Sequence, residues 1–425
     1  MELGDLESRV ADWKLAVQGG KPVRTAPMPR RIAMGDGELA MLNEALQAYR
    51  AEGLDPGYQG VYEKRYTDAF VHLMGGGYAD AVATGTASIW LSIAALDLPK
   101  GSEVIVSPIT DPGTLGSIIL NGLTPRLADA RPGLYNMGAA QVEARLGPKV
   151  SAVCVVHSGG QATEVDRIVS LVRPKGIRVV EDCSQSHGAS INGRPIGTFG
   201  DIAAFSTMYR KPHMTGGSGG VVYTRDLGLF RQALAHADRG KPRWDASFDD
   251  RNPENYLFPA LNWNTDELSC AIGIASLSRL QDTIRARLAF IAELASLVAD
   301  LDTMFSLYPW TPRDSPFILQ VFVDPKRTTA SKIEVSQALR AEGIDLNPHY
   351  RYVVWDWPWI RPYLADDFDT PVARDVRDRS FCLYLNENYG EAEAADIAAA
   401  MLKVHRALGI ETAAARLGSI PIVAR

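Results

Sequence analysis

Long apolar runs are missing from the sequence, because charged residues or glycines interrupt each one before it reaches the length of a membrane span. Residues 1–20 are acidic and amphipathic, unlike a signal peptide. Dense blocks of Lys and Arg are missing as well, and the formal net charge is −6, which argues against nucleic acid and anionic membranes as partners. We therefore expect a cytoplasmic protein that binds neither nucleic acid nor membrane.

Cysteine is scarce, with four residues in a chain of 425, and no two of them form a CxxC pair. They occur singly and mostly inside apolar segments, which predicts reduced, buried thiols in a cytosolic protein rather than a disulfide framework or a zinc site. We therefore expect no metal. The four cysteines are Cys154, Cys183, Cys270 and Cys382.

The rest of the composition is that of a folded protein, with 46% apolar and 22% charged residues. A chain of 425 residues is longer than a single hydrophobic core usually supports. We predict an N-terminal segment (1–25), a large α/β domain (26–285), a smaller α+β domain (286–410) and a tail (411–425).

Short apolar strands alternate with helical patterns through the large domain. The strands are apolar on both faces, as in a parallel sheet covered by helices on both sides. The predicted fold class is therefore α/β, with a mostly parallel central sheet. After about residue 270, the stretch 268–301 predicts a long helix with one break. The predicted strands include "EVIVSP", "TPRLADA", "VSAVCVVH", "IRVVEDC", "DIAAFST" and "GGVVYT".

Two acids, Glu181 and Asp182, stand where the apolar run "KGIRVV" ends. An aspartate at such a place can simply cap a helix. Parallel sheets, however, bind ligands at the carboxyl ends of their strands, so Asp182 is also a candidate for function.

Three strand ends carry polar residues of complementary chemistry. The turn "ATGTAS" (83–88) opens a helix whose bare amides suit a phosphate. Asp182 ends the second strand, and Ser206 ends the third, followed by Lys211 and "TGGSGG". This is no Walker loop, because the lysine precedes the glycines. A phosphate cradle, a carboxylate and a lysine together indicate pyridoxal 5'-phosphate as the cofactor.

The segments "EDCSQSHGA", "GTFGDIAAFS", "MTGGSGGVVYT" and "GGKPVR" together resemble the DegT/DnrJ/StrS family of sugar aminotransferases, over roughly residues 20 to 405. The resemblance implies a fold-type I, pyridoxal-phosphate-dependent enzyme. It also implies transfer of an amino group from glutamate or glutamine to a keto sugar, either nucleotide-linked or a cyclitol, in amino-sugar biosynthesis. A homodimer with shared active sites is implied as well.

The resemblance assigns a role to each matching residue. Lys211 corresponds to the lysine that carries the cofactor and moves a proton, and Asp182 to the carboxylate that pairs with the pyridine nitrogen. Gln185 corresponds to the side chain near the phenolic oxygen, and Asn262 to an asparagine that reaches the neighbouring subunit's cofactor phosphate. The residues similar to the family's own phosphate site are Gly85, Thr86, Ala87 and Ser206.

The substrate half of the chain departs from the family. Asp111 stands where a stacking aromatic residue is usual, and Asn264 stands where arginine is usual. Asp111, His349 and Tyr350 are therefore the candidate substrate contacts.

Two alternatives remain open at this stage. The first is a dehydratase of the same family, in which histidine replaces the lysine; His213 lies two residues beyond Lys211. The second is a non-catalytic binding or regulatory protein with the same fold. His157 either lines the cleft or packs in the core, and His187 is expected to orient its loop or pack against the sheet.

Overall fold

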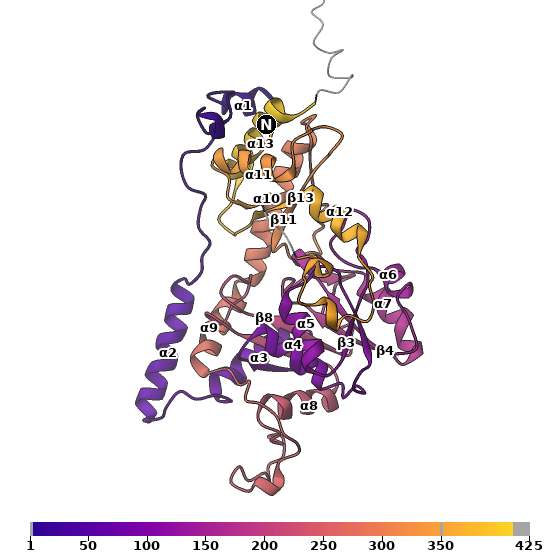
Figure 1. Ribbon diagram of the computed structural model, residues 1–425. Helices are drawn as coiled ribbons and strands as arrows, with labels where there is room; N and C mark the ends of the chain where they lie inside the picture. The colour runs from indigo at the N-terminus through magenta and orange to yellow at the C-terminus, as the bar shows by residue number, and fades with distance from the viewer. Residues whose placement is uncertain (1–2, 349–351, 411–425) are drawn as a thin grey trace, which may run out of the picture.

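The computed structural model (Figure 1) describes residues 3–348 and 352–410. Its centre is a seven-stranded sheet in the order β1-β9-β8-β5-β4-β2-β3. Pairing is parallel from β8 through β5, β4 and β2 to β3, and β9, which lies between β1 and β8, runs in the direction opposite to all the other strands. The prediction of a mostly parallel sheet is confirmed. The strands are β1 Tyr78–Val82, β2 Glu103–Val106, β3 Thr124–Leu127, β4 Val150–Val156, β5 Arg178–Asp182, β8 Ile202–Ser206 and β9 Gly220–Thr224.

Alternate residues of the same strand enter two different cores, because successive side chains point to opposite faces of a sheet. In β4, Val153 and Val155 join one core, while Ala152 and Cys154 join the other. The first core is completed by α3 (Val61–Leu73), α7 (Val165–Val172) and α9 (Glu267–Ser278), and the second by α4 (Gly85–Ala94), α5 (Pro112–Leu120) and α8 (Leu227–Ala237). This double burial explains the unbroken apolar runs in the sequence.

A smaller antiparallel sheet lies above the large one in Figure 1, in the order β10-β11-β13-β12. It packs with helices α10, α11 and α13 around its own core. Its elements are β10 Phe305–Leu307, β11 Ile318–Val323, β12 Leu346–Asn347, β13 Ser380–Tyr384, α10 Leu280–Ala299, α11 Lys332–Ala341, α12 Pro371–Arg379 and α13 Glu391–Leu408.

The long helix predicted over 268–301 is present as α9 and α10, broken at Arg279 as expected. The predicted domain boundary at residue 285 falls inside α10 and stays a prediction, and the predicted tail, 411–425, lies outside the described residues. The remaining elements are α1 Leu3–Ser8, α2 Asp36–Glu52, α6 Ala139–Glu143, β6 Ser190–Ile191 and β7 Arg194–Pro195.

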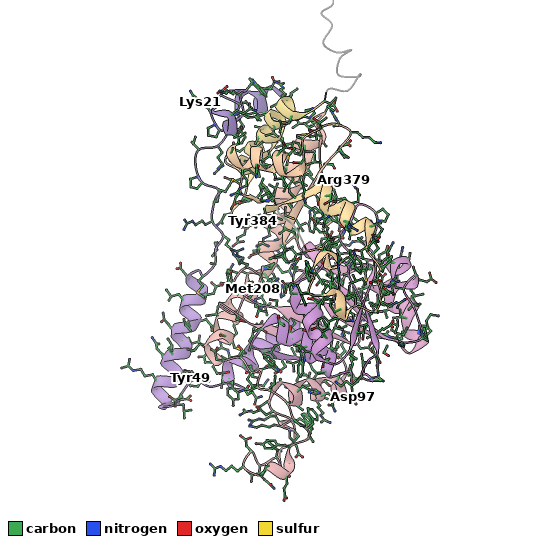
Figure 2. The ribbon with its side chains drawn as sticks, viewed as in Figure 1. Lys21, Tyr49, Asp97, Met208, Arg379 and Tyr384 are labelled. Carbon is green, nitrogen blue, oxygen red and sulfur yellow. The ribbon has the colours of Figure 1, made fainter. Side chains whose placement is uncertain are left out.

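The N-terminal segment is bound through its backbone to a buried ion pair of the C-terminal sheet unit. Lys403 Nζ lies 2.8 Å from Glu342 Oε2, and neither side chain is exposed. Glu342 also accepts backbone N–H groups of Ala16 and Val23, so one carboxylate holds two points of the segment. Figure 2 shows Lys21 at this end of the molecule; its carbonyl accepts from Lys403 Nζ at 2.7 Å.

All four cysteines are free and buried in the structure, and the predicted burial of the thiols is confirmed. Among the described residues, no helix combines the length and the apolar character that a membrane crossing requires.

Candidate active site

Asp182 is the last residue of β5, at the carboxyl edge of the parallel strands, and is 3% exposed. Its Oδ1 accepts the backbone N–H of Ser184 at 3.1 Å, and its Oδ2 accepts the hydroxyl of Thr114 at 3.0 Å. The buried carboxylate is thus held at both oxygens by groups from two segments. Asp182 caps no helix in the described structure, because β5 is followed by a turn.

Glu181 points to the opposite face of β5 and has a structural role. Its Oε1 accepts the N–H groups of Phe199 and Gly200 at 2.7 and 2.6 Å, and its Oε2 accepts that of Gly197 at 2.7 Å. The carboxylate therefore shapes the 197–200 turn that leads into β8. The alternation of strand side chains places the two adjacent acids on opposite faces of the sheet, with Glu181 toward the 197–200 turn and Asp182 toward Thr114 of α5.

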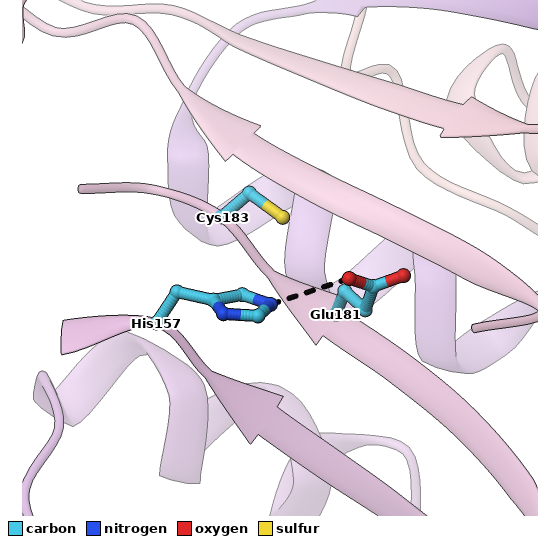
Figure 3. A group of neighbouring side chains, drawn as sticks. All are labelled: His157, Glu181 and Cys183. Carbon is cyan, nitrogen blue, oxygen red and sulfur yellow. Dashed lines mark hydrogen bonds and ion pairs between the residues drawn. The ribbon is translucent and has the colours of Figure 1, made fainter. Parts of the chain in front are cut away.

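His157, Glu181 and Cys183 form a buried group with metal-ligand chemistry (Figure 3). His157 Nδ1 accepts the N–H of Thr163 at 3.1 Å, so Nε2 carries the proton and donates to Glu181 Oε2 at 3.2 Å. Both ring nitrogens are thus engaged, and burial raises the pKa of the Cys183 thiol well above its usual value. His157 is a core histidine that fixes Glu181.

Lys211 follows β8 and is 9% exposed. Its Nζ lies 4.7 Å from the centre of the Phe317 ring. Burial lowers the pKa of Lys211 from 10.5 to about 8, against the opposing fields of Asp182 and Asp111. Figure 2 shows Met208 between the two sheet units, and its carbonyl accepts the Lys211 N–H at 2.9 Å.

Arg31, which the sequence analysis did not single out, holds the backbone around this lysine. Its guanidinium donates to the carbonyls of Tyr209 and Lys211 at 3.3 and 2.9 Å. The contact joins positions 180 apart in the sequence, and no local motif signals it.

The predicted phosphate turn lies between β1 and α4 and touches the end of β8. A Cβ on Gly85 would lie 2.4 Å from the Cβ of Ser206, so only glycine permits this approach. Thr84 is the N-cap and accepts the N–H of Ala87 at 2.8 Å. The amides of Gly85 and Thr86 have no intrahelical acceptor, as is general for a first turn.

Gln185 is oriented by the backbone. The N–H of Gly159 donates to Gln185 Oε1 at 2.7 Å, which leaves the amide NH₂ as its donor group. The Gly159 carbonyl accepts the N–H of Phe317, so this loop also connects the site to the smaller sheet unit.

Asp111 is exposed and is the N-cap of α5, where its Oδ1 accepts the N–H of Gly113 at 2.8 Å. A Cβ on Gly113 would lie 2.6 Å from Thr86 Oγ1, so the start of α5 abuts the phosphate turn. The cap explains an acid at this position: Pro112 opens the helix, and aspartate is among the best capping residues.

Asn262 lies on the loop between α8 and α9, beside the strand that leads to the phosphate turn of its own chain. The N–H of Ala83 donates to the Trp263 carbonyl at 2.7 Å. Asn264 donates to Asn262 Oδ1 through Nδ2 at 2.8 Å, and Gln59 Nε2 donates to Asn264 Oδ1 at 3.1 Å. The free donor of Asn262 is therefore its side-chain NH₂.

His213 points into the core. Its Nε2 is 2.6 Å from the hydroxyl of Tyr66, and burial lowers its pKa to about 3. The ring packs edge-on against His187, which lies against Phe205 of β8. His187 thus packs against the sheet, as predicted. The buried position of His213 removes the basis for a dehydratase in which it would replace Lys211.

The arrangement fits pyridoxal phosphate on three counts: a buried amine of lowered pKa at Lys211, the strand-end carboxylate of Asp182, and the close Gly85 turn. The other predicted substrate contacts, His349 and Tyr350, lie outside the described residues.

Comparison with known proteins gives concordant results. The model of the DegT/DnrJ/EryC1/StrS aminotransferase family matches residues 40–402. A Streptoalloteichus tenebrarius protein bearing the name of an L-glutamine:3-amino-2,3-dideoxy-scyllo-inosose aminotransferase is 28% identical over 418 residues, 92% of this chain and 98% of its own. A Micromonospora echinospora protein of the same name is 27% identical over 386 residues, 85% and 90% of the two chains. The solved aminotransferase from Psychrobacter cryohalolentis superposes with a TM-score of 0.82 at 24% identity, covering 90% of this chain and all of the other.

Proposed function

The chain belongs to the DegT/DnrJ/EryC1/StrS aminotransferase family and is a pyridoxal-phosphate-dependent aminotransferase, and from that premise we propose that glutamine is its amino donor and a keto cyclitol its acceptor. The two relatives above, each matched over nearly the whole chain, carry names that specify L-glutamine and an inosose. The observation that carries the proposed chemistry is the buried amine of Lys211, which lies within the electrostatic field of the buried strand-end carboxylate of Asp182.

Pyridoxal phosphate supplies, when bound, an electron sink for the carbanion formed at the donor's α-carbon. Lys211 would hold the cofactor and would move the proton, for which a pKa of about 8 is well matched to neutral pH. Asp182 would stabilise the protonated pyridine nitrogen, and the Gln185 NH₂, which is left as a donor because Oε1 accepts the Gly159 N–H, would donate to the phenolic oxygen.

The free amides of Gly85 and Thr86 and the Ser206 hydroxyl would bind the phosphate, because a helix N-terminus attracts anions. The predicted contribution of the Ala87 amide is secondary, since that N–H already donates to Thr84.

The acceptor proposal draws on the polarity of the site. Asp111 adds a second carboxylate near Lys211, and Asn264 provides no positive charge. Nucleotide-linked sugars carry a diphosphate, which proteins bind with cationic side chains. A neutral or amine-bearing keto cyclitol suits this site better. Asp111, His349 and Tyr350 are proposed to contact it.

A screen of donors and acceptors tests this assignment. Purified protein is incubated with L-glutamine or L-glutamate and a panel of keto cyclitols and nucleotide-linked keto sugars, and keto acid release is followed, with Lys211→Ala as the inactive control. Activity on keto cyclitols with glutamine supports the proposal. Activity on nucleotide-linked sugars alone contradicts the acceptor class.

We further propose a cytoplasmic homodimer with shared active sites. Apolar side chains are exposed along α2 and on the loops beside the Asn262 segment, and α2 packs mainly on α9 (Figure 1). Exposed apolar side chains of this kind, when they gather in a patch, are typical of a subunit interface. The exposed residues are Leu39, Leu46, Leu54, Val61, Leu257 and Leu261.

Subunit complementation tests the sharing. If Asn262 acts on the partner's phosphate, mixing the inactive variants Lys211→Ala and Asn262→Asp restores activity, because mixed dimers contain one complete site. A mixture whose activity equals only the sum of the activities of the two separate variants contradicts a shared site.

A further inference from the structure

We propose that Thr110 and Thr114 form a directed hydroxyl chain that keeps Asp182 in its charged, nitrogen-facing state. The inference rests on the proposed function of Asp182. Thr114 Oγ1 donates to Asp182 Oδ2 at 3.0 Å, and Thr110 Oγ1 lies 2.8 Å from Thr114 Oγ1. Thr114 is fully buried and Thr110 is 6% exposed, so water does not compete for these bonds.

The number of available protons decides which hydroxyl donates in the bond between Thr110 and Thr114. A hydroxyl has one proton, and an ionised carboxylate can only accept, so the Thr114 proton points to Asp182. Thr114 must then accept from Thr110 in their mutual bond. Two hydroxyls in series polarise each other, which strengthens the bond to the carboxylate.

The start of α5 fixes this geometry. Asp111 is the N-cap and Pro112 the first helical residue, so Thr110 and Thr114 face each other across the first turn. The Asp111 cap thus both opens the helix and aligns the hydroxyls. Both hydrogen bonds of the hydroxyl chain are made within the protein, so neither depends on the cofactor being bound.

The consequence concerns the proton between the carboxylate and the cofactor's ring nitrogen. Because Asp182 is buried and shielded from water, this proton can rest on either group. Hydrogen bonds donated to a carboxylate stabilise its charged form, so the chain keeps the proton on the nitrogen, where it is needed to draw electrons into the ring. Thr114 is therefore a positioning residue that acts through Asp182.

Cofactor affinity, measured on the full chain without turnover, tests the inference. Apoprotein is titrated with pyridoxal phosphate and with its 1-deaza analogue, in which C–H replaces the ring nitrogen. Thr114→Val should bind pyridoxal phosphate about tenfold more weakly than wild type, as expected for a lost hydrogen bond to a charged group. Its affinity for the deaza analogue should be unchanged, because that ring has no nitrogen proton to hold.

Two matched variants complete the design. Thr114→Ser keeps the hydroxyl and should bind both compounds as wild type does. Thr110→Val removes only the outer hydroxyl and should show a smaller loss, again confined to pyridoxal phosphate. Equal losses for both compounds, or no loss in either valine variant, overturn the inference. Wild-type protein that binds neither compound refutes the proposed function, and the inference with it; wild-type binding with unaffected valine variants refutes the inference alone.

Discussion

Replacing Lys211 with methionine should stabilise the cofactor-free protein at neutral pH while abolishing activity. Methionine keeps most of the apolar stem that packs near Phe317 and removes the buried charge. Burial lowers the pKa of Lys211 from 10.5 to about 8. At 1.36 kcal/mol per pH unit, this difference is a penalty of about 3 kcal/mol on the folded state.

The direction in which the free energy of unfolding changes with pH follows from the difference in Lys211 pKa between the folded and unfolded states. Between pH 8 and pH 10.5 the unfolded chain still binds the Lys211 proton and the folded chain does not, so wild-type stability rises with pH across this window. Below pH 8 the full penalty is present. The advantage of Lys211→Met should therefore be about 3 kcal/mol at pH 7 and should shrink as the pH approaches 10.5.

Urea unfolding of the wild-type and Lys211→Met apoproteins at pH 7 and pH 9.5 measures the difference in their free energies of unfolding. The comparison requires that this free energy falls with urea concentration at the same slope in both proteins. Lys64→Met is the matched control, because the Lys64 side chain is 74% exposed and its ion pair with Asp68 is on the surface. The control should change stability by less than about 1 kcal/mol at either pH. A Lys211→Met protein that is no more stable than wild type at pH 7, or whose advantage is independent of pH, refutes the reasoning.

Three further predictions concern the carboxylates. Asp182→Asn should lower kcat about a hundredfold or more, measured by keto acid release, because an amide cannot stabilise the nitrogen's charge; near-normal turnover would contradict its role. Glu181→Gln should destabilise the fold by roughly 2–4 kcal/mol in urea, because it weakens the hydrogen bonds from three backbone amides and from His157, and an unchanged midpoint would argue against that role. Asp111→Asn should leave stability within about 0.5 kcal/mol, since asparagine caps helices equally well. It should also shift the acidic limb of cofactor binding to lower pH, because Asp111 raises the pKa of Lys211 and the free amine is the form that bonds the cofactor; an unchanged pH profile would show that the two groups do not interact.

The strands and their polar ends were predictable because double burial leaves a strong pattern in the sequence. The runs around Val153 and Val180 are apolar on both faces, and their polar ends must meet at one sheet edge. The placement of the Glu181 and Asp182 side chains on opposite faces of the sheet could also be predicted, since adjacent strand residues point to opposite faces.

The contacts that orient the site could not be read from the sequence. Thr114 and Asp182 are 68 positions apart, and their meeting depends on β2 lying next to β4 and β4 next to β5. Arg31 reaches the Lys211 carbonyl from a segment with no regular structure. Such contacts follow from the tertiary arrangement, and neither periodicity nor a local motif encodes them.

The most direct test of the account is to find which lysine carries the cofactor. The holoprotein is reduced with sodium borohydride, digested, and its peptides are analysed by mass spectrometry. We predict a phosphopyridoxyl group on Lys211 and on no other lysine. A group on a different lysine, or a protein that takes up pyridoxal phosphate yet yields no modified peptide, would contradict the central claim.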